Sequence, residues 1–247
     1  MINIEISVLA SGSNGNACLV EDKQTSVLID AGKSGKELIK RASRLNKSLE
    51  TLSGILLTHG HSDHIQSAGI LSRKFGTPIY MTPGMYADIK FKLGKINYKL
   101  FNHNTKFKIN TLTIEPVKTS HNIDSSGYVI ENFGLFTDTG KITSHIEKVL
   151  PKLKTILLES NHDIDTLIKG PYPYHLKQWI LSDKGHLSNF DAAQLINKYG
   201  SNLDLVLLGH LSGTNNTSEL TKHTFETLVK HKLNYEICSR HSVTGSF

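Results

Sequence analysis

The stretch His59-Gly60-His61-Ser62-Asp63-His64 directly follows an apolar run at residues 55–57 that has the length of a buried strand. Four side chains that can bind a metal ion occur within these six residues. Residues two apart in an extended chain project to the same side, so His59 and His61 can bind one ion together. Asp63 and His64 fall where the chain turns into a helix pattern over residues 65–75, so they can face a neighbouring ion. A solvated polar loop is the alternative, but this density of donors favours a metal site.

Ligand-type residues also end or follow later apolar runs. They are His121, Asp138, Glu159 and His210. A single Asp or His after a strand is usually a cap or a hydrogen-bonding residue. A series of them is different, because catalytic groups of layered α/β folds gather where rigid strands end in loops. The series therefore supports the metal site indicated by the first stretch.

The number of donors predicts two ions. The expected ligands are His59, His61, Asp63, His64, His121, Asp138 and His210. These are too many for one tetrahedral ion, and two ions that share Asp138 would use them all. One ion would take His59, His61 and His121, and the other would take Asp63, His64 and His210. Imidazole and carboxylate donors suit Zn, Mn or Fe, and a metal pair lowers the pKa of a bridging water so that hydroxide is available to attack phosphorus.

Length and composition indicate one soluble globular domain. The chain has 247 residues, of which 38% are hydrophobic and 20% charged, and residues 1–247 contain no repeat or linker that would divide them. Short apolar runs alternate with amphipathic segments, which predicts the α/β class. No apolar run is long enough to span a membrane. The two cysteines cannot form a disulfide framework, so a cytoplasmic location is expected.

Local signals predict several element boundaries. The residues at 11–16 form a dense turn signal between two strands. Pro83 behind Thr82 is typical of a first helical position behind an N-cap. Ser188 or Asn189 can cap a helix that Gly200 ends.

The His-x-His-x-Asp-His cluster, followed by separated His, Asp and His residues, resembles the metallo-β-lactamase-fold hydrolases. That resemblance implies a four-layer αββα sandwich with a dinuclear metal site at the sheet edges. Within this superfamily the chain is most similar to the YycJ/WalJ group of bacterial proteins. The similar segments lie at residues 9–16, 28–32, 159–163, 185–189 and 210–216. The resemblance implies a 5′-to-3′ exodeoxyribonuclease acting on DNA with a 5′ end.

The same resemblance suggests a general acid. Similar phosphodiesterases pair a glutamate with a histidine to protonate the leaving oxygen, and Glu159 and His186 fit these roles. A histidine bonded to the backbone beside a helix is an equally good account of His186. With Asp63, these two residues complete the candidate catalytic set. Asp30 ends an apolar run and is expected to hydrogen-bond a ligand histidine, although a simple turn aspartate explains it equally well.

Polar residues crowd around the two Gly-His-Leu-Ser segments, at residues 185–188 and 209–212, and can hold a terminal phosphate. These candidates are Ser188, Asn189, Ser212, Asn215 and Asn216. Helix capping is the alternative for Ser188 or Asn189.

The chain carries 28 Lys and Arg against 22 Asp and Glu, a net charge of +6. Basic clusters lie at residues 33–47 and at Lys90, Lys92, Lys95 and Lys99, and they are either solvated faces or phosphate contacts.

Three functions remain open at this point. The first is a dinuclear metal-dependent phosphodiesterase acting on DNA. The second uses the same metal pair to hydrolyse a small ester, thioester, lactone or cyclic phosphodiester. The third is a non-catalytic sensor of a ligand or metal, which the complete donor set disfavours.

The interval between Asp138 and His210 is too short for an inserted clamping domain, so the core domain alone or a homodimer would bind the polymer.

Overall fold

The computed structural model describes residues 2–247, and the chain divides into two compact units. Unit 1 comprises the residues up to Pro116, Ile123–Ser126 and Ser239–Phe247. Unit 2 comprises Val117–Asn122 and Gly127–Cys238. The expectation of a single domain over residues 1–247 stays a prediction.

Unit 1 contains a seven-stranded mixed sheet in the order β14-β1-β2-β3-β4-β5-β6. β14, β1, β2 and β3 pair antiparallel, whereas β3, β4, β5 and β6 are parallel to one another. The carboxyl ends of β3, β4 and β5 therefore meet at one edge. The strands are β1 (Glu5–Ala10), β2 (Ala17–Glu21), β3 (Ser26–Ile29), β4 (Gly54–Leu56), β5 (Ile79–Met81), β6 (Tyr98–Leu100) and β14 (Gly245–Ser246).

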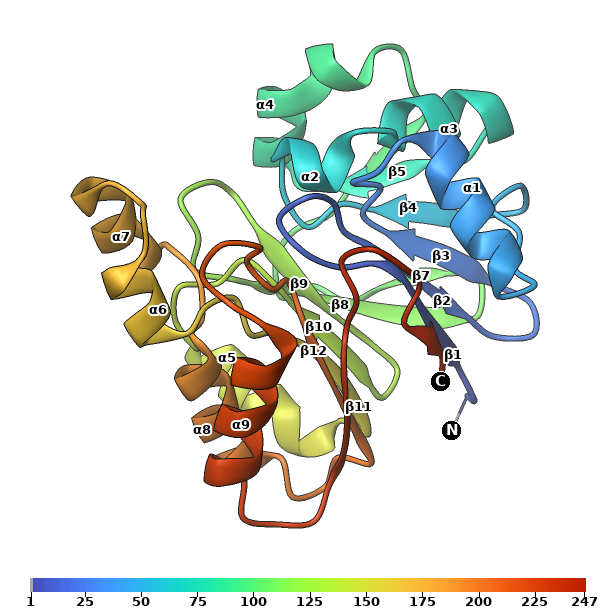
Figure 1. The fold of residues 1–247 in the computed structure, drawn as a ribbon. Coiled ribbons are helices and arrows are strands. Elements are labelled where there is room, and N and C mark those ends of the chain that lie inside the picture. Colours follow the sequence, from blue (N-terminus) through green and yellow to red (C-terminus); the bar gives the residue numbers. More distant parts are fainter. Residues whose placement is uncertain (1) are drawn as a thin grey trace. The chain divides into compact units, whose positions relative to one another are not determined.

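The helices of unit 1 cover one face of this sheet (Figure 1). They bury alternate strand residues such as Leu28, Ile55 and Ile79 against Leu38 and Leu71. Residues 27–29, 54–56 and 79–81 are all buried, which explains why these strands are short continuous apolar runs in the sequence. The helices are α1 (Gly35–Arg44), α2 (Ser62–Ile65), α3 (Ala68–Phe75) and α4 (Pro83–Leu93). A hairpin of β7 (Phe107–Ile109) and β8 (Leu112–Lys118) follows, and β8 enters unit 2 after Pro116.

Unit 2 also contains parallel strands whose carboxyl ends share one edge of a sheet. β9 and β10 pair antiparallel, and β10, β11, β12 and β13 run parallel, so the carboxyl ends of the last four strands also share one edge. Phe136, Leu158 and Leu208 pack with Ile146, Ile196 and Phe225 of the helices, and five of these six side chains are at most 1% exposed. The strands are β9 (Ser126–Ile130), β10 (Phe133–Phe136), β11 (Thr155–Glu159), β12 (Leu205–Gly209) and β13 (Asn234–Ile237). The helices are α5 (Ser144–Val149), the 3₁₀ helix η1 (Leu150–Lys152), α6 (Ile164–Lys169), α7 (Tyr174–Ile180), α8 (Asn189–Tyr199) and α9 (Ser218–Leu228).

Most predicted boundaries are confirmed. Thr82 caps α4 with Pro83 in its first turn, and Ser188 caps α8, which ends at Gly200. The single helix expected over residues 65–75 is wrong in detail, because the chain forms α2 and then α3 with Ser67 between them. The break follows from the interaction of Ser67 with the 30–32 loop, whose Ala31 carbonyl accepts from both the Ser67 N–H and its hydroxyl. Within residues 2–247, no helix has the length and apolar character needed to cross a membrane.

Candidate metal centre and active site

In unit 1, a buried carboxylate organises the histidines that follow β4. Asp30 comes directly after β3, and it accepts hydrogen bonds from the Thr58 backbone N–H at 2.8 Å and from the Thr58 hydroxyl at 2.8 Å. Its Oδ2 also lies 2.7 Å from His64 Nδ1. When Asp30 is ionised its carboxylate can only accept, so the proton of this contact then lies on His64 Nδ1 and Nε2 keeps its lone pair for a metal ion.

Thr58 extends the same arrangement to His59. Its hydroxyl gives its proton to Asp30, so it accepts at 3.0 Å from His59 Nδ1. His59 Nε2 is then the unprotonated nitrogen, and it lies 2.9 Å from His61 Nδ1. The two histidines therefore present ring nitrogens at one point, as the sequence predicts. The predicted contact of Asp30 with a ligand histidine is present. The hydrogen bonds that link Thr58 to Asp30 and His59 were not predicted from the sequence, and the position of Thr58 directly before His59 is the only signal that could have indicated them.

The turn at residues 11–16 and the loop at 30–32 hold α2 in place. The Asn16 N–H donates to the Asp63 carbonyl at 2.8 Å, and the Ala31 N–H donates to the His64 carbonyl at 2.7 Å. The Asn16 side-chain amide lies 3.0 Å from His64 Nε2, and His64 Nε2 lies 3.4 Å from Asp63 Oδ2. Gly32 permits this approach, because a Cβ there would lie 1.7 Å from the Asp63 carbonyl oxygen. The sequence marks this turn but not its contact with the donors.

Burial raises the pKa of the Asp30 carboxyl above its usual value. The charge and hydrogen bond of His64 and the hydrogen bonds from Thr58 oppose that rise. Asp30, His59 and His64 are all at most 2% exposed, so these interactions operate away from bulk water. The result is a rigid set of imidazole donors held by one carboxylate.

In unit 2, Glu159 occupies the corresponding position at the end of β11. Its Oε1 lies 2.7 Å from His186 Nδ1 and 2.8 Å from His210 Nδ1. Its Oε2 accepts from the backbone N–H groups of Thr139 at 2.9 Å and Leu187 at 3.3 Å. From the sequence, we predicted that Glu159 would pair with His186 alone. The contact with His210 adds a second task, because the same carboxylate fixes the ring of an expected metal ligand.

The electrostatics of Glu159 follow from these partners. Burial opposes ionisation, but the charges and hydrogen bonds of His186 and His210 outweigh it and hold the pKa of Glu159 well below its usual range. Both histidines therefore donate from Nδ1 to an ionised carboxylate, which leaves each Nε2 available for a ligand or a proton.

Donor atoms of four residues in unit 2 lie within 4.8 Å of one another: Asp138, Glu159, His186 and His210. Asp138 Oδ1 lies 3.6 Å from His210 Nε2 and 3.8 Å from His186 Nδ1. The His121 ring lies 5.5 Å from the ring of His186 and 6.2 Å from Trp179, centroid to centroid. Buried imidazoles and carboxylates with fixed tautomers fit a divalent metal ion, so the donor sets of both units support metal binding.

The five residues expected to bind substrate lie together, and all are buried. Ser188 accepts from the Asp191 N–H at 3.1 Å as a helix cap, and Ser212 accepts from the Asn215 N–H at 3.1 Å. The side chains of Asn189 and Asn216 hydrogen-bond each other at 2.9 Å, and Asn216 also donates to the Ser160 carbonyl. These contacts anchor the loops that carry His186 and His210 and the loop that follows Glu159. Direct contact of the five residues with substrate stays a prediction.

Comparison with known proteins defines the family. The model of the beta-lactamase superfamily domain matches residues 25–210, which is more than half of the chain. The chain belongs to the beta-lactamase superfamily. Within this superfamily, the chain is 36% identical over 234 residues to "Exodeoxyribonuclease WalJ" of Streptococcus pneumoniae, and the match covers 90% of this chain and 87% of that protein. It is 33% identical over 242 residues to "Exodeoxyribonuclease YycJ" of Bacillus anthracis, covering 94% and 91%.

Solved structures show the same fold for this superfamily member. The metallo-β-lactamase fold protein YhfI from Bacillus subtilis matches with a TM-score of 0.77 and 18% identity, covering 100% of this chain and 99% of that chain. At this identity the match shows the fold alone. Together these findings confirm the predicted resemblance, the α/β metallo-β-lactamase fold class and the assignment as a hydrolase of this superfamily.

Proposed function

We propose that this chain is a metal-dependent exodeoxyribonuclease that hydrolyses phosphodiesters of DNA from a 5′ end. The likeness to the WalJ and YycJ exodeoxyribonucleases over about nine tenths of the chain supports the reaction and the polymer. The structural observation that carries the proposal is the Glu159 carboxylate in contact with both His186 and His210. This contact joins a proton donor to a metal ligand through one buried group.

We further propose that the seven donors predicted from the sequence hold two divalent ions per chain, from Zn, Mn or Fe. His59, His61 and His121 would hold one ion, Asp63, His64 and His210 the other, and Asp138 would serve both. The imidazole and carboxylate chemistry of the donors in each unit supports this assignment. When bound, such ions polarise a phosphoryl oxygen and lower the pKa of water. The 5′ polarity, the cytoplasmic location and the homodimer stay predictions.

Residues of unit 2 would supply the proton that the leaving 3′ oxygen needs. Departure of a 3′ oxygen from a phosphodiester needs a proton, because the oxyanion is a poor leaving group. His186 can carry this proton on Nε2, since its Nδ1 donates to Glu159 at 2.7 Å. The contact with Glu159 fixes the direction of the ring. Glu159 thus acts as a positioning residue, and His186 is the proposed general acid.

An end-labelled assay tests the activity. Purified protein is incubated with Mn or Zn and with 5′-labelled duplex DNA, and in parallel with small esters and lactones. Release of labelled mononucleotides is expected. Turnover of an ester with intact DNA would overturn the nuclease and favour the small-molecule hydrolase, and metal-loaded protein inert toward every substrate would favour a sensor.

His186→Ala tests the general acid. We expect turnover of DNA to fall about 10²–10⁴-fold with metal content unchanged, because one proton donor is lost. A p-nitrophenyl phosphodiester should be affected much less, because its leaving group departs without a proton. His175→Ala, on the exposed surface of α7, is the matched control. Equal losses on both substrates, or loss of metal in step with activity, would contradict the role.

A further inference from the structure

A pocket of about 310 Å³ lies in unit 1 beside β6, at the edge of the sheet. Its wall includes the side chains of Tyr80, Lys99, Phe101, Asn102, Phe107 and Lys108. Ligand pockets of proteins range from about 300 to 1,000 Å³, so this one has room for a single small planar group. It lies outside the donors described above, and nothing in the proposed chemistry uses it.

Three stacked aromatic rings form part of this pocket. The Tyr80 and Phe107 rings lie 5.6 Å apart between centroids and are nearly parallel, at 6°. The Phe101 and Phe107 rings lie 5.4 Å apart at 20°. Tyr80 and Phe101 are buried, while Phe107 is half-buried and open toward the pocket. A planar aromatic group can continue this stack, because ring faces are tolerant of any flat π-system.

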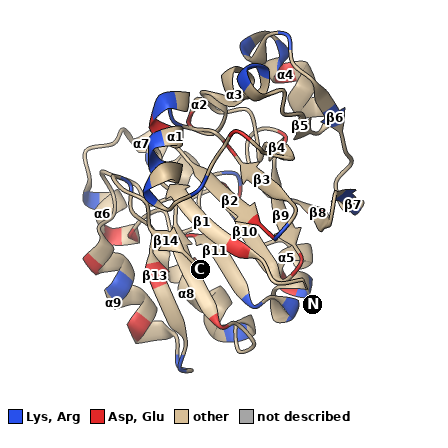
Figure 2. Cartoon of the chain, turned by 90° about the vertical axis from the view of Figure 1, so that its right-hand side faces the viewer, with Lys and Arg blue, Asp and Glu red and all other residues tan. Residues whose placement is uncertain are grey.

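The surroundings of the pocket are basic. Residues 83–108 contain the lysines 90, 92, 95, 99, 106 and 108, all of them exposed, and Asp88 is the acidic residue of that stretch. Figure 2 shows the blue positions on α4, β6 and β7. Lys99 Nζ lies 5.5 Å from the centre of the Tyr80 ring, and Lys106 pairs with Glu115 at 3.0 Å. The remaining lysines give this surface a positive charge that suits an anionic partner.

The same surface adjoins the donor loop of unit 1. α4 packs directly on the loop between His59 and His61, since a Cβ on Gly60 would lie 2.5 Å from Ile89 Cγ2. α4 also presents Phe91, which is 88% exposed, with Lys90 Nζ 5.1 Å from its ring centre. A chain bound along α4 and β6 would therefore lead toward the donors.

We propose that this pocket holds one unpaired base of a nucleic-acid strand, while lysines of α4, β6 and β7 contact its phosphates. The inference rests on the proposed nuclease function and adds a strand-binding subsite to it. Stacked rings beside lysines are the combination that binds single strands without regard to sequence. The exposed amide of Asn102 at the rim can hydrogen-bond a base edge. A paired base cannot enter a pocket of this size, so the occupant is single-stranded.

Binding of a fluorescent twelve-nucleotide thymidine strand tests the subsite. The strand carries phosphorothioate linkages that resist hydrolysis, so metal-loaded protein can be used. The variant K99Q/K108Q should bind about tenfold more weakly, and the slope of log affinity against log salt should become shallower by about 1.4, since each lost phosphate contact removes about 0.7 for a single strand. Turnover of a p-nitrophenyl phosphodiester should not change.

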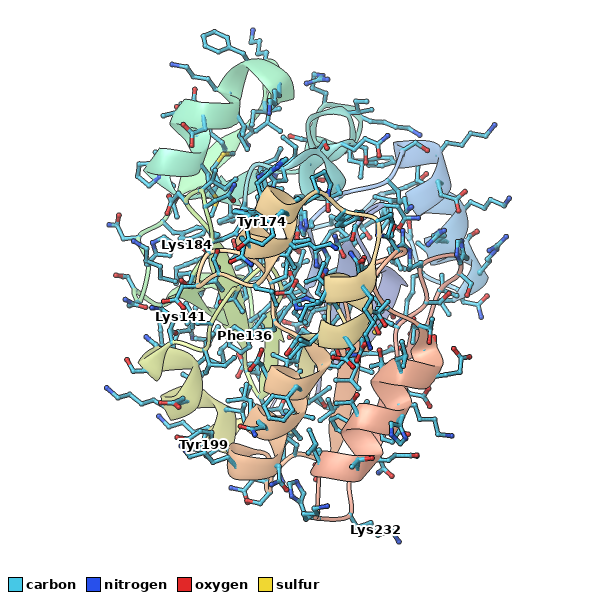
Figure 3. All side chains as sticks on the ribbon, turned by 60° about the vertical axis from the view of Figure 1, so that its left-hand side comes forward. Phe136, Lys141, Tyr174, Lys184, Tyr199 and Lys232 are labelled. Atoms are coloured by element: carbon cyan, nitrogen blue, oxygen red, sulfur yellow. The ribbon has the colours of Figure 1, made fainter. Side chains whose placement is uncertain are left out.

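The control K152Q/K232Q removes the same charge from exposed lysines of unit 2 and should leave affinity and slope unchanged. Lys232 lies at the turn before β13 and points away from the fold (Figure 3). A second probe carries one 2-aminopurine base, whose fluorescence is quenched when it stacks. Wild-type protein should quench it, and F107L, verified as folded by its melting curve, should restore the emission.

Three results would overturn the subsite, and they differ in what they say of the nuclease. If wild-type protein degrades DNA but K99Q/K108Q keeps its affinity and salt slope, the subsite is wrong and the nuclease stands. If wild-type protein neither binds the strand nor degrades DNA, both proposals fall. A loss shared equally by the two lysine pairs would also reject the subsite, because it would reflect net charge alone.

Discussion

At Asp30, Asp138 and His210, the backbone lies in the left-handed region, with φ of 61°, 54° and 57°. This conformation is strained for residues other than glycine, at a cost of about 1–3 kcal/mol each. Each of the three follows a buried strand that pairs in parallel with a neighbour. The sequence identified these residues by type and by position after a strand. It could not reveal the left-handed conformation, because local preference opposes it and tertiary contacts impose it.

His162 gives a prediction at the same scale. It is 1% exposed, neither ring nitrogen has a hydrogen-bond partner within the described residues, and burial lowers its pKa from the usual 6.5 to about 4. The unfolded chain therefore binds this proton more readily between these values, so stability is lost as pH falls from about 6.5 toward 4. From pH 7 to pH 5 the loss due to His162 is about 2 kcal/mol.

Urea unfolding of wild type and His162→Leu at pH 7 and pH 5 measures this loss. The variant should lose about 2 kcal/mol less than wild type over that interval, because it has no group to protonate. His162→Gln should behave like His162→Leu in this difference, whatever its own stability. Equal losses in all three proteins would show that His162 protonates equally well in the folded chain.

At the scale of elements, the short helix α2 depends on two loops far from it in sequence. Its residues Asp63 and His64 are held by backbone hydrogen bonds from Asn16 and Ala31. The sequence predicted the turn at residues 11–16 from its Gly and Asn content, and the structure confirms it. Its contact with α2 could not be predicted, because nothing in a local pattern says which loop another loop will meet.

Gly32→Ala tests this dependence. The added Cβ would meet the Asp63 carbonyl oxygen at 1.7 Å and the Asn16 nitrogen at 2.5 Å, and both are backbone atoms that cannot move away alone. We expect a loss of about 1–3 kcal/mol in stability and weaker binding of Zn, because Asp63 and His64 are displaced. Thermal melting and chelator competition measure the two effects.

Gly35→Ala is the matched control, because a Cβ there meets its nearest neighbour, Leu71 Cδ2, at an ordinary 3.4 Å. This variant should keep both stability and Zn affinity. If Gly32→Ala also keeps its Zn affinity, the loop at residues 30–32 does not position the donors of α2.

At the scale of the whole molecule, the two units share the same arrangement of donor residues around a buried carboxylate. Each places donors after parallel strands and holds two histidines through one buried carboxylate, Asp30 in unit 1 and Glu159 in unit 2. Strand-end position was visible in the sequence, so the donors could be named. The sharing of Glu159 between His186 and His210 was not visible, because it depends on the register of β11 beside β12.

The proposed metal pair makes a prediction about ligands that lie far apart in the sequence. His61 and His121 are proposed to hold the same ion, whereas His210 is proposed to hold the other. His61→Ala and His121→Ala should therefore each remove one tightly bound Zn, and the double variant should lose no more than either single one. His61→Ala combined with His210→Ala should lose both ions. The reason is that effects on a shared ligand shell are not additive, while effects on separate ions are. Metal content after dialysis against a weak chelator gives the stoichiometry of each variant, and loss of two ions by His61→Ala/His121→Ala would show that the two histidines serve different ions.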